Sequence, residues 1–375
     1  MKPVIPFKLS FFLIVVLMEV FSFSTEGKDI RSYVAAEDAT EATTQGGGEE
    51  EKVVEISLRD ALGQTLLIGF EGTEVTPELA ELIVEIRPGG ILLLGRNIEN
   101  AEQTRQLIAD LQEFSFRYMG IPLFVAVDQE GRPVTRVTWA ELQTAQAELE
   151  SFNHAYQIGA ARARELKDLG FNMNLAPVLD SQSPDDYLSS RSFQGNSEDI
   201  REVARGLVLG HEKEKVLVVP KHFPGYDDVS FNPENNVIPE VSELPSIDVF
   251  QDVFFSTNQQ FIMVAHVIYE SVDPVRPFPF SKVGIELIRD VLSRDIVVMS
   301  DDLTSEAIID QYNVAEIGAR SLAAGVDILL LAGHKNPGVI GDFYEGLVKL
   351  VEQDEYLQAQ VAASAQKIIQ IKKTL

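Results

Sequence analysis

The sequence contains no cysteine among its 375 residues. Disulfide bonds, thiolate metal sites and a lipid-modified amino-terminal cysteine are therefore excluded, although this absence alone leaves the cellular compartment open. Basic residues are also scarce, with 31 Lys and Arg against 58 Asp and Glu and a formal net charge of -27. Because such a charge opposes binding to nucleic-acid phosphates and anionic lipid surfaces, we expect no nucleic-acid partner and a neutral or cationic ligand.

Several motifs that carry chemistry are absent as well. No G-x-G-x-x-G or G-x-x-x-x-G-K-[ST] sequence follows an apolar run, so nucleotide-binding folds lose their usual support. The five histidines show no H-E-x-x-H or H-x-H spacing, and we expect neither a catalytic metal nor a cofactor. A Ser-His-Asp hydrolase is disfavoured because there is no G-x-S-x-G elbow.

Residues 1–24 have the pattern of a secretory signal peptide. Two lysines precede the apolar run at 11–18, which is too short to cross a bilayer comfortably. Residues 22–25 match a small-residue cleavage site poorly, and an acidic residue interrupts the apolar region, so an uncleaved amino-terminal anchor is the alternative. We expect a secreted or periplasmic protein with no membrane partner beyond such an anchor.

Residues 25–55 are predicted to form a disordered acidic linker. They include the run GGGEEE at 46–51 and contain too few large apolar side chains to offset the entropy lost on ordering. From residue 56 to residue 375, short apolar runs alternate with helical patterns, and no second domain boundary is visible. The sequence therefore predicts one folded domain over residues 56–375.

Short apolar runs in this domain are predicted to be strands. There are eight of them: residues 66–70, 90–94, 123–127, 171–176, 216–219, 261–265, 296–299 and 328–331. Their residues are continuously apolar rather than alternating, which is typical of parallel strands buried on both faces. Amphipathic stretches such as 101–114 and 200–212 lie between them. This pattern favours the α/β class and a single (β/α)8 TIM-like barrel over an open doubly wound sheet.

Polar residues, nearly all of them charged or titratable, follow five of the predicted strands. They are Asp128, Gln129 and Glu130, then Asp180, then Lys221 and His222, then His266, and finally Asp301 and Asp302. Active sites of such barrels lie where strands end and the following loops begin, so we expect a functional mouth here. With Arg136 and Arg191 nearby, the mouth suits a polyhydroxylated substrate, because carboxylates and guanidinium groups pair with sugar hydroxyls.

A family resemblance follows from motifs that occur in a fixed order. They are DQEG at 128–131, NLAPVLD at 174–180, RSF at 191–193, KHFPG at 221–225 and SDDL at 300–303. Together they resemble glycoside hydrolase family 3, specifically its single-barrel β-N-acetylhexosaminidase branch, from about residue 63 to the last residue. The resemblance implies a retaining glycosidase that acts on β-linked hexosides, above all β-N-acetylhexosaminides such as cell-wall fragments, so the expected partner is a carbohydrate.

The resemblance also implies roles for individual residues. Asp301 corresponds to the nucleophile, and Asp302 is the better candidate for capping a helix that begins near Thr304. The positions that bind the sugar correspond to Asp128, Arg191, Lys221 and His222. A structural alternative exists for two of them, because Asp128 could simply pair with an arginine and Arg191 could form a loop salt bridge. Glu130 and Asp180 are expected to support these residues, and His266 to pack at its strand end.

The loop after KHFPG departs from the family pattern. The branch reads K-H-F-P-G-H-G-[DN]-T-x-x-D-[ST]-H, in which the Asp-x-His pair supplies the general acid/base. Here Tyr226 stands at the first loop histidine, Asn232 at the Asp and Glu234 at the catalytic His. Glu234 could replace the histidine only if its pKa rises well above its usual value of about 4.3, and a solvated loop acid is the alternative.

Two further loops differ: the family carries Gly-Arg where this chain has Arg132-Pro133, and Gly where it has Gln194. Altered loops around an intact scaffold are compatible with changed specificity or with lost turnover. The sequence therefore predicts a retaining β-N-acetylhexosaminidase with Asp301 and Glu234 as its catalytic pair, and another loop acid or water is the alternative source of the proton. The alternative is a pseudoenzyme that binds carbohydrate without hydrolysing it.

Overall fold

The computed structural model describes residues 56–375 except 142, 181–182, 236 and 334–337. The predictions for the signal segment, residues 1–24, and for the acidic linker, residues 25–55, lie outside the described residues. None of the described helices is both long enough and apolar enough to span a bilayer.

Every strand predicted from an apolar run is present, although most are shorter than predicted. They are β1 (Leu66–Ile68), β2 (Gly90–Leu93), β3 (Phe124–Val127), β6 (Met173–Asn174), β7 (Leu217–Val218), β9 (Phe261–Val264), β11 (Val297–Ser300) and β12 (Leu329–Leu331). Six of these strands form one parallel sheet in the order β12-β1-β2-β3-β6-β7, and β9 pairs with β11 in parallel. Neighbouring strands in the chain are thus neighbours in space, as in a barrel.

No continuous ladder joins the six-stranded sheet to the β9–β11 pair within the described residues, but single parallel bridges do so on both sides. Phe223, just beyond β7, bridges to Val264 in β9, and Met299 in β11 bridges to Ile328 beside β12. Backbone pairing therefore passes through all eight strands in chain order. The predicted α/β fold with a TIM-like barrel is confirmed in its strand order and parallel direction.

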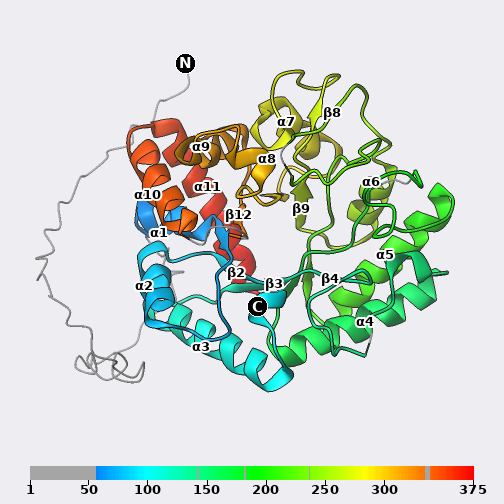
Figure 1. Ribbon diagram of the computed structural model, residues 1–375, viewed down its shortest axis with the longest axis horizontal. Helices are drawn as coiled ribbons and strands as arrows, with labels where there is room; N and C mark the ends of the chain where they lie inside the picture. The colour runs from blue at the N-terminus through cyan, green and yellow to red at the C-terminus, as the bar shows by residue number, and fades with distance from the viewer. Residues whose placement is uncertain (1–55, 142, 181–182, 236, 334–337) are drawn as a thin grey trace, which may run out of the picture. The chain divides into compact units, whose positions relative to one another are not determined.

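Helices follow the strands and lie outside them (Figure 1). They are α1 (Leu58–Gln64), α2 (Pro77–Ile86), α3 (Ala101–Met119), α4 (Phe152–Leu169), α5 (Ser197–Lys213), α6 (Asp248–Ser256), α7 (Lys282–Val291), α8 (Glu306–Ile309), α9 (Val314–Ala324), α10 (Val339–Glu352) and α11 (Glu355–Lys372). Asparagine caps begin α3 and α5, since Asn100 and Asn196 accept hydrogen bonds from backbone N–H groups of the first turn.

Short extra elements lie in the connections. An antiparallel hairpin joins β4 (Gln129–Gly131) to β5 (Val134–Thr135), and β8 (Glu240–Val241) pairs in parallel with β10 (Ile268–Tyr269). Single turns of 3-10 helix occupy Gly95–Asn97, Gln146–Glu148 and Phe278–Phe280. The hairpin and the β8–β10 pair follow strand ends, so they build the loops that carry the polar residues.

Two apolar clusters stabilise the domain. One contains inward-facing strand residues such as Leu92, Phe124 and Phe261, and the rings of the two phenylalanines meet edge to face at 5.6 Å between centroids. Ile368 and Ile371 of α11 belong to the same cluster, so the last helix closes the end of the strands that lies away from the polar loops. The larger cluster lies between the strands and the surrounding helices. Continuous burial of the strands on both faces explains their unbroken apolar sequences.

Candidate active site

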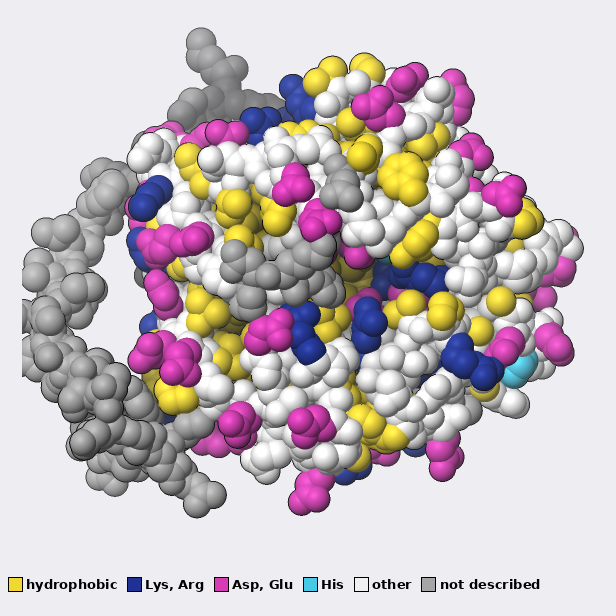
Figure 2. Space-filling model, in the orientation of Figure 1, with side chains coloured by type: hydrophobic (Ala, Val, Ile, Leu, Met, Phe, Trp, Pro, Cys, Tyr) yellow, Lys and Arg dark blue, Asp and Glu magenta, His cyan; other side chains and the backbone are white. Residues whose placement is uncertain are grey.

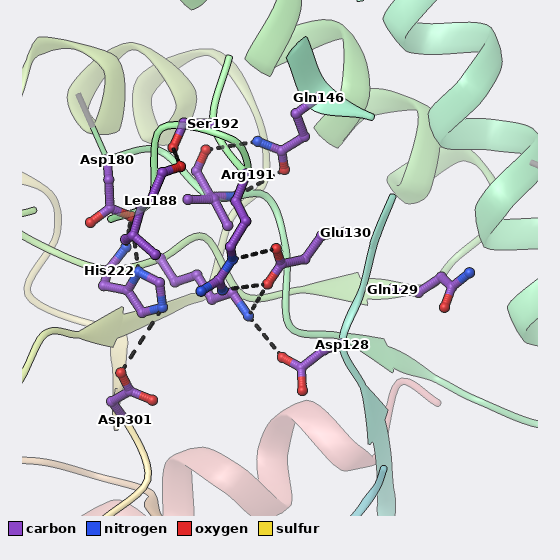
Figure 3. A network of polar contacts seen from close by, with 12 residues as sticks. Asp128, Gln129, Glu130, Gln146, Asp180, Leu188, Arg191, Ser192, His222 and Asp301 are labelled. Atoms are coloured by element: carbon purple, nitrogen blue, oxygen red, sulfur yellow. Dashed lines mark hydrogen bonds and ion pairs between the residues drawn. The ribbon is translucent and has the colours of Figure 1, made fainter. Parts of the chain in front are cut away.

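The residues that follow the strand ends converge on one polar network (Figure 3). The ammonium group of Lys221 lies 2.8 Å from Oδ1 of Asp128 and 2.8 Å from Oε1 of Glu130. Arg191 donates two hydrogen bonds to Glu130, from Nη2 to Oε1 at 2.7 Å and from Nε to Oε2 at 2.9 Å. Segments that end β3 and β7 and the loop after β6 are thereby joined. Paired, charge-assisted bonds of this kind hold side chains in a defined geometry.

Electrostatics keep this network ionised. Burial opposes ionisation of Asp128, but the neighbouring charges of Lys221 and Arg136 outweigh it and hold the pKa of the carboxyl well below its usual range. Burial lowers the pKa of Lys221, but the negative charges of Asp128 and Glu130 raise it by a larger amount, so the net shift is upward. The side chain of Lys221 is only 3% exposed, so each of its charged partners is needed to offset the loss of hydration.

Several Lys and Arg side chains lie in and beside a hollow of the molecular surface, and others, together with Asp and Glu side chains, lie elsewhere on the face shown (Figure 2). The chain as a whole has a formal net charge of -27. The cations of the site lie against carboxylates, as Lys221 does against Asp128 and Glu130, and the net charge of the chain does not reveal this local pairing.

His222 is held in one orientation by Asp180. Oδ2 of Asp180 accepts hydrogen bonds from both the backbone N–H and the ring Nδ1 of His222, each at 2.9 Å. Because the carboxylate is an acceptor, Nδ1 carries a proton and the other ring nitrogen is directed away from Asp180. That nitrogen, Nε2, lies 4.0 Å from Oδ2 of Asp301. The two halves of the predicted site therefore face each other.

Asp301 lies at the end of β11 and is 8% exposed. Its Oδ1 accepts the backbone N–H of Asp302 at 2.8 Å, and its Oδ2 accepts the hydroxyl of Tyr226 at 3.2 Å. Burial raises the pKa of this carboxyl, but His222 and His266 lower it by more, so the net shift is downward. An ionised, oriented carboxylate with histidine beside it is suited to nucleophilic attack.

The prediction that Asp302 caps a helix is wrong. The next helix, α8, begins at Glu306 and has no side-chain cap at Ser305. Instead, Oδ1 of Asp302 accepts hydrogen bonds from the backbone N–H and hydroxyl of Thr304 and, at 2.9 Å, from the backbone N–H of Ala332. Asp302 therefore closes a turn and ties the end of β11 to the end of β12, which fixes the backbone on which Asp301 stands.

Glu234 lies in the loop that follows β7 and is solvent-exposed. Its carbonyl oxygen accepts the backbone N–H of Ala307 at 3.1 Å, which anchors this loop to α8 just beyond Asp301 and Asp302. Partial desolvation and then the negative charges of Asp301 and Asp302 raise the pKa of Glu234 to about 7. Because the side chain is exposed, water weakens the desolvation effect, whereas the charges of the two aspartates act in the same direction.

The structure brings five of the six predicted site residues into direct contact or near contact: Asp128, Arg191, Lys221, His222 and Asp301. The sixth, Glu234, is linked to them by its charge interaction with Asp301. Both structural alternatives are also present, because Asp128 pairs with Arg136 at 3.5 Å and Arg191 forms a loop salt bridge with Glu130. Each alternative contact coexists with a position in the mouth, so neither removes the residue from the site.

Tyr226 is the contributor to which the sequence did not point. In the sequence it is only a departure from the family pattern, yet its hydroxyl contacts Asp301 and its backbone N–H donates to Oδ1 of Asp180 at 2.8 Å. His266 packs at its strand end as expected, 1% exposed, and its backbone N–H donates to the Tyr226 hydroxyl at 2.6 Å. No local pattern around Tyr226 gives these contacts, because they link two different strand ends.

Two further hollows lie away from this network. They adjoin the amino-terminal ends of β7, β9 and β11, are lined by residues such as Leu217, Phe261 and Ile296, and include no predicted site residue. Their charged lining residues, Glu212 and Lys215 in one and Asp295 and Lys367 in the other, do not belong to the network at the strand ends, so that hydrogen-bonded network and not hollow volume defines the site. Among the described residues, no three His, Asp or Glu side chains are arranged to hold a metal ion.

Fold and site together define a class: a parallel (β/α)8-type barrel with an ionised carboxylate, a second acid of raised pKa and a buried cation at the carboxyl ends of its strands. The profile described as Glycosyl hydrolase family 3 N terminal domain matches residues 51–371. The chain belongs to this family, and the resemblance seen in its motifs is confirmed.

Individual relatives agree with this assignment. Proteins named Beta-hexosaminidase from Haemophilus influenzae and Pasteurella multocida are 30% and 31% identical to it, over 80% and 74% of this chain and 87% and 81% of theirs. Among solved structures, a glycoside hydrolase family 3 β-N-acetylglucosaminidase from Paenibacillus sp. is 28% identical with a TM-score of 0.77 over 85% of this chain. This chain spans only 63% of that longer protein.

Proposed function

We propose that this protein is a retaining glycoside hydrolase that cleaves β-N-acetylhexosaminides. Membership of glycosyl hydrolase family 3 and relatives named as hexosaminidases support the activity and the substrate class. The observation that carries the mechanism is the ionised Asp301 carboxylate, held at the end of β11 with His222 only 4.0 Å away. A nucleophile needs such a charged, oriented oxygen beside the sugar.

In the first step Asp301 and Glu234 act together. A carboxylate oxygen of Asp301 forms a bond to the anomeric carbon while the bond from that carbon to the leaving oxygen breaks. Glu234 transfers its proton to the leaving oxygen, so the product alcohol departs neutral and Glu234 becomes ionised. A pKa of about 7 leaves a substantial fraction of Glu234 protonated at neutral pH, as a proton donor requires.

In the second step the roles of Glu234 reverse. The ionised Glu234 accepts a proton from a water molecule, whose oxygen bonds to the anomeric carbon as the ester bond to Asp301 breaks. The sugar leaves with its original configuration, Asp301 is again a carboxylate, and Glu234 is again protonated. This cycle needs one acid that is ionised and one that is protonated, and the different environments of Asp301 and Glu234 give them different pKa values.

The Lys221 network binds the sugar in this proposal. Lys221, Asp128 and Arg191 present donors and acceptors at fixed positions because each is already tied to another member of the network. Such a preorganised set can exchange a hydrogen bond with a sugar hydroxyl without first reordering long side chains. His222 lies between this network and Asp301, where it can contact the same sugar ring.

The non-catalytic alternative receives less support. The relatives from Haemophilus influenzae, Pasteurella multocida and Paenibacillus sp. are named as hydrolytic enzymes, and none of these names describes a binding protein. Replacement of the family's acid/base histidine, which motivates the alternative, leaves a carboxyl group of raised pKa at that position. We therefore favour turnover over binding alone.

Hydrolysis of 4-nitrophenyl β-N-acetylglucosaminide by the purified protein tests the proposal. We expect turnover in the wild-type protein and a loss of about a thousandfold in kcat/KM for Asp301→Ala. The matched control is Asp310→Asn, which changes an exposed aspartate. Asp327 would not serve, because its carboxylate pairs with Arg289 and its removal would affect the fold. An Asp301→Ala protein as active as Asp310→Asn would rule out the mechanism, and binding of the sugar without any turnover would favour the non-catalytic alternative.

We also propose that the protein is exported, as the pattern of residues 1–24 predicts. Mass spectrometry of the mature amino terminus after expression in a Gram-negative host, together with periplasmic fractionation, tests this. Cleavage near residue 24 and recovery in the periplasm are expected, whereas an intact amino terminus in the membrane fraction would favour the anchor.

A further inference from the structure

Tyr226 is buried beside the proposed nucleophile. It is 2% exposed, and its hydroxyl oxygen lies 3.2 Å from Oδ2 of Asp301 and 2.6 Å from the backbone nitrogen of His266. Its ring meets the ring of His222 edge to face, with 5.1 Å between centroids. Two strand ends and one loop therefore meet at this single side chain.

The direction of the bond between Tyr226 and Asp301 follows from a count of protons. A backbone N–H can only donate, so the Tyr226 oxygen accepts from His266 through a lone pair. The phenol has one proton, which is then available for Asp301, and an ionised carboxylate can only accept. Burial and the charge of Asp301 raise the pKa of Tyr226 well above its ordinary value, so this proton is retained.

The carboxylate of Asp180 holds in place both Tyr226 and His222, the two residues beside Asp301. Oδ1 of Asp180 accepts the backbone N–H of Tyr226, while Oδ2 accepts the backbone N–H and ring of His222. Asp180 therefore fixes the loop from 222 to 226 in the position from which both side chains reach Oδ2 of Asp301. With Oδ1 bonded to the backbone N–H of Asp302, the Asp301 carboxylate has a donor on each oxygen and cannot rotate freely.

We propose that Tyr226 is a positioning residue whose hydroxyl stabilises the free carboxylate of Asp301 and thereby speeds release of the sugar from the glycosyl-enzyme. The proposal rests on the function proposed above, in which Asp301 forms an ester with the anomeric carbon. A hydrogen-bond donor stabilises the carboxylate more than the less basic ester oxygen, so it lowers the barrier to breaking the ester and raises the barrier to forming it.

Other charged groups around Asp301 set the background against which Tyr226 acts. They are His222 and Lys221 after β7, His266 after β9, Glu234 in the following loop and Asp302 on β11's own end. The histidines and the lysine favour ionisation of Asp301, while the two acids oppose it. Tyr226 is uncharged, so its removal changes hydrogen bonding and leaves the charge of the site unaltered.

Tyr226→Phe tests the proposal, with Tyr269→Phe as the matched control. Tyr269 is also buried, and its hydroxyl donates to the carbonyl of Gly225 in the same loop without contacting Asp301. With an aryl substrate whose leaving group departs readily, Tyr226→Phe should lower kcat about tenfold and lower KM as well, because the glycosyl-enzyme accumulates. The acidic limb of kcat/KM should move to higher pH, since the carboxylate has lost a donor.

The control separates this role from a purely structural one. Tyr269→Phe should leave the acidic limb and the ratio of kcat to KM unchanged, whatever it does to the melting temperature. The proposal is overturned if Tyr226→Phe keeps the wild-type acidic limb and kcat, or if both variants lose kcat and kcat/KM equally. In either case the wild-type enzyme and Asp301→Ala still report separately on the proposed function.

Discussion

Nε2 of His222 lies 4.0 Å from Oδ2 of Asp301, although the two residues follow strands β7 and β11, which do not pair with each other. Strand β9 lies between them, and His266 at its end donates its backbone N–H to Tyr226. The contact shows that the Lys-His motif and the Asp-Asp motif open into the same mouth. A retaining mechanism requires this, because the nucleophile and the sugar-binding residues must reach one sugar ring.

Asp301 is expected to carry the covalent intermediate. A 5-fluoro N-acetylhexosaminyl fluoride should inactivate the wild-type enzyme with time. The electron-withdrawing ring fluorine slows both formation and breakdown of the ester, but the reactive fluoride leaving group speeds formation, so the ester accumulates. Peptide mass spectrometry should find the sugar on the peptide that contains Asp301. A label on Glu234 or on Asp302 instead would reassign the nucleophile.

Glu234 is expected to set the basic limb of the pH profile. A proton donor with a raised pKa is active below that pKa and loses activity above it, so kcat/KM should fall as the pH rises through about 7. In Glu234→Gln this limb should disappear. The rate should drop about a hundredfold for a poor leaving group and much less for a dinitrophenyl glycoside, which needs no proton.

The matched control for this change is Glu240→Gln, which alters an exposed acid later in the same connection. Azide should restore turnover of the activated glycoside to Glu234→Gln, because the azide anion bonds to the anomeric carbon as the ester bond to Asp301 breaks, which releases a glycosyl azide without a general base. A Glu234→Gln enzyme with an intact basic limb would show that another group supplies the proton.

Lys221 is expected to stabilise the fold as well as bind the sugar. Lys221→Met leaves Asp128 and Glu130 in the mouth without their shared cation and should lower the free energy of unfolding at pH 7 by about 3 kcal/mol. Both carboxyls have lowered pKa values in the native state, so their stabilisation is present above the unfolded pKa and is lost as the pH falls. The difference between wild type and variant in urea unfolding should therefore shrink at acidic pH.

The exposed Lys349→Met on α10 serves as the control for the loss of one positive charge. It should change the free energy of unfolding by less than about 0.5 kcal/mol at either pH. Equal effects of the two substitutions would contradict a specific role for the Lys221 network.

Lys372 is expected to make stability rise with pH. Its ammonium group is buried beneath the barrel, 2.7 Å from Oε1 of Gln64, and burial lowers its pKa to about 7. Between this value and the unfolded value of about 10.4 the unfolded chain binds a proton that the native state lacks. Native stability should then increase by up to about 1.4 kcal/mol per pH unit in that window.

Lys372→Met removes this titration, so the difference in free energy of unfolding between wild type and variant should grow in favour of wild type from pH 7 to pH 10. The exposed neighbour Lys373→Met should run parallel to wild type throughout. Parallel curves for Lys372→Met as well would mean that Lys372 stays charged in the native state.

The strands could be predicted from sequence because burial on both faces leaves an unbroken apolar run. Runs such as 261–265 and 296–299 correspond to β9 and β11 with little change in their bounds. The run at 171–176 shortens to Met173–Asn174, since beyond it Pro177 and the isolated bridge between Val178 and Lys221 replace regular pairing. Apolar composition reports burial, whereas the limits of a strand depend on which partner groups lie alongside.

The site residues could be named because polar side chains directly after buried strands have few purely structural uses. The directions in which these side chains point could not be predicted from the sequence in the same way. Asp301 and Asp302 are adjacent carboxylates, yet Asp301 faces His222 while Asp302 bonds the backbone of β12. Alternation along the chain predicts that the two point in different directions, but only the neighbouring strands decide which one meets the sugar.

By itself, the sequence determined the barrel class, the order of its strands and the membership of a glycosidase family, because these depend on residue type and on spacing along one chain. Only the tertiary structure decided that Tyr226 donates to Asp301, that Asp180 holds both Tyr226 and His222, and that Lys372 lies buried beneath the barrel. Each of these facts joins residues that are distant in sequence. Such contacts arise when separate strand ends pack together, and no local pattern records them.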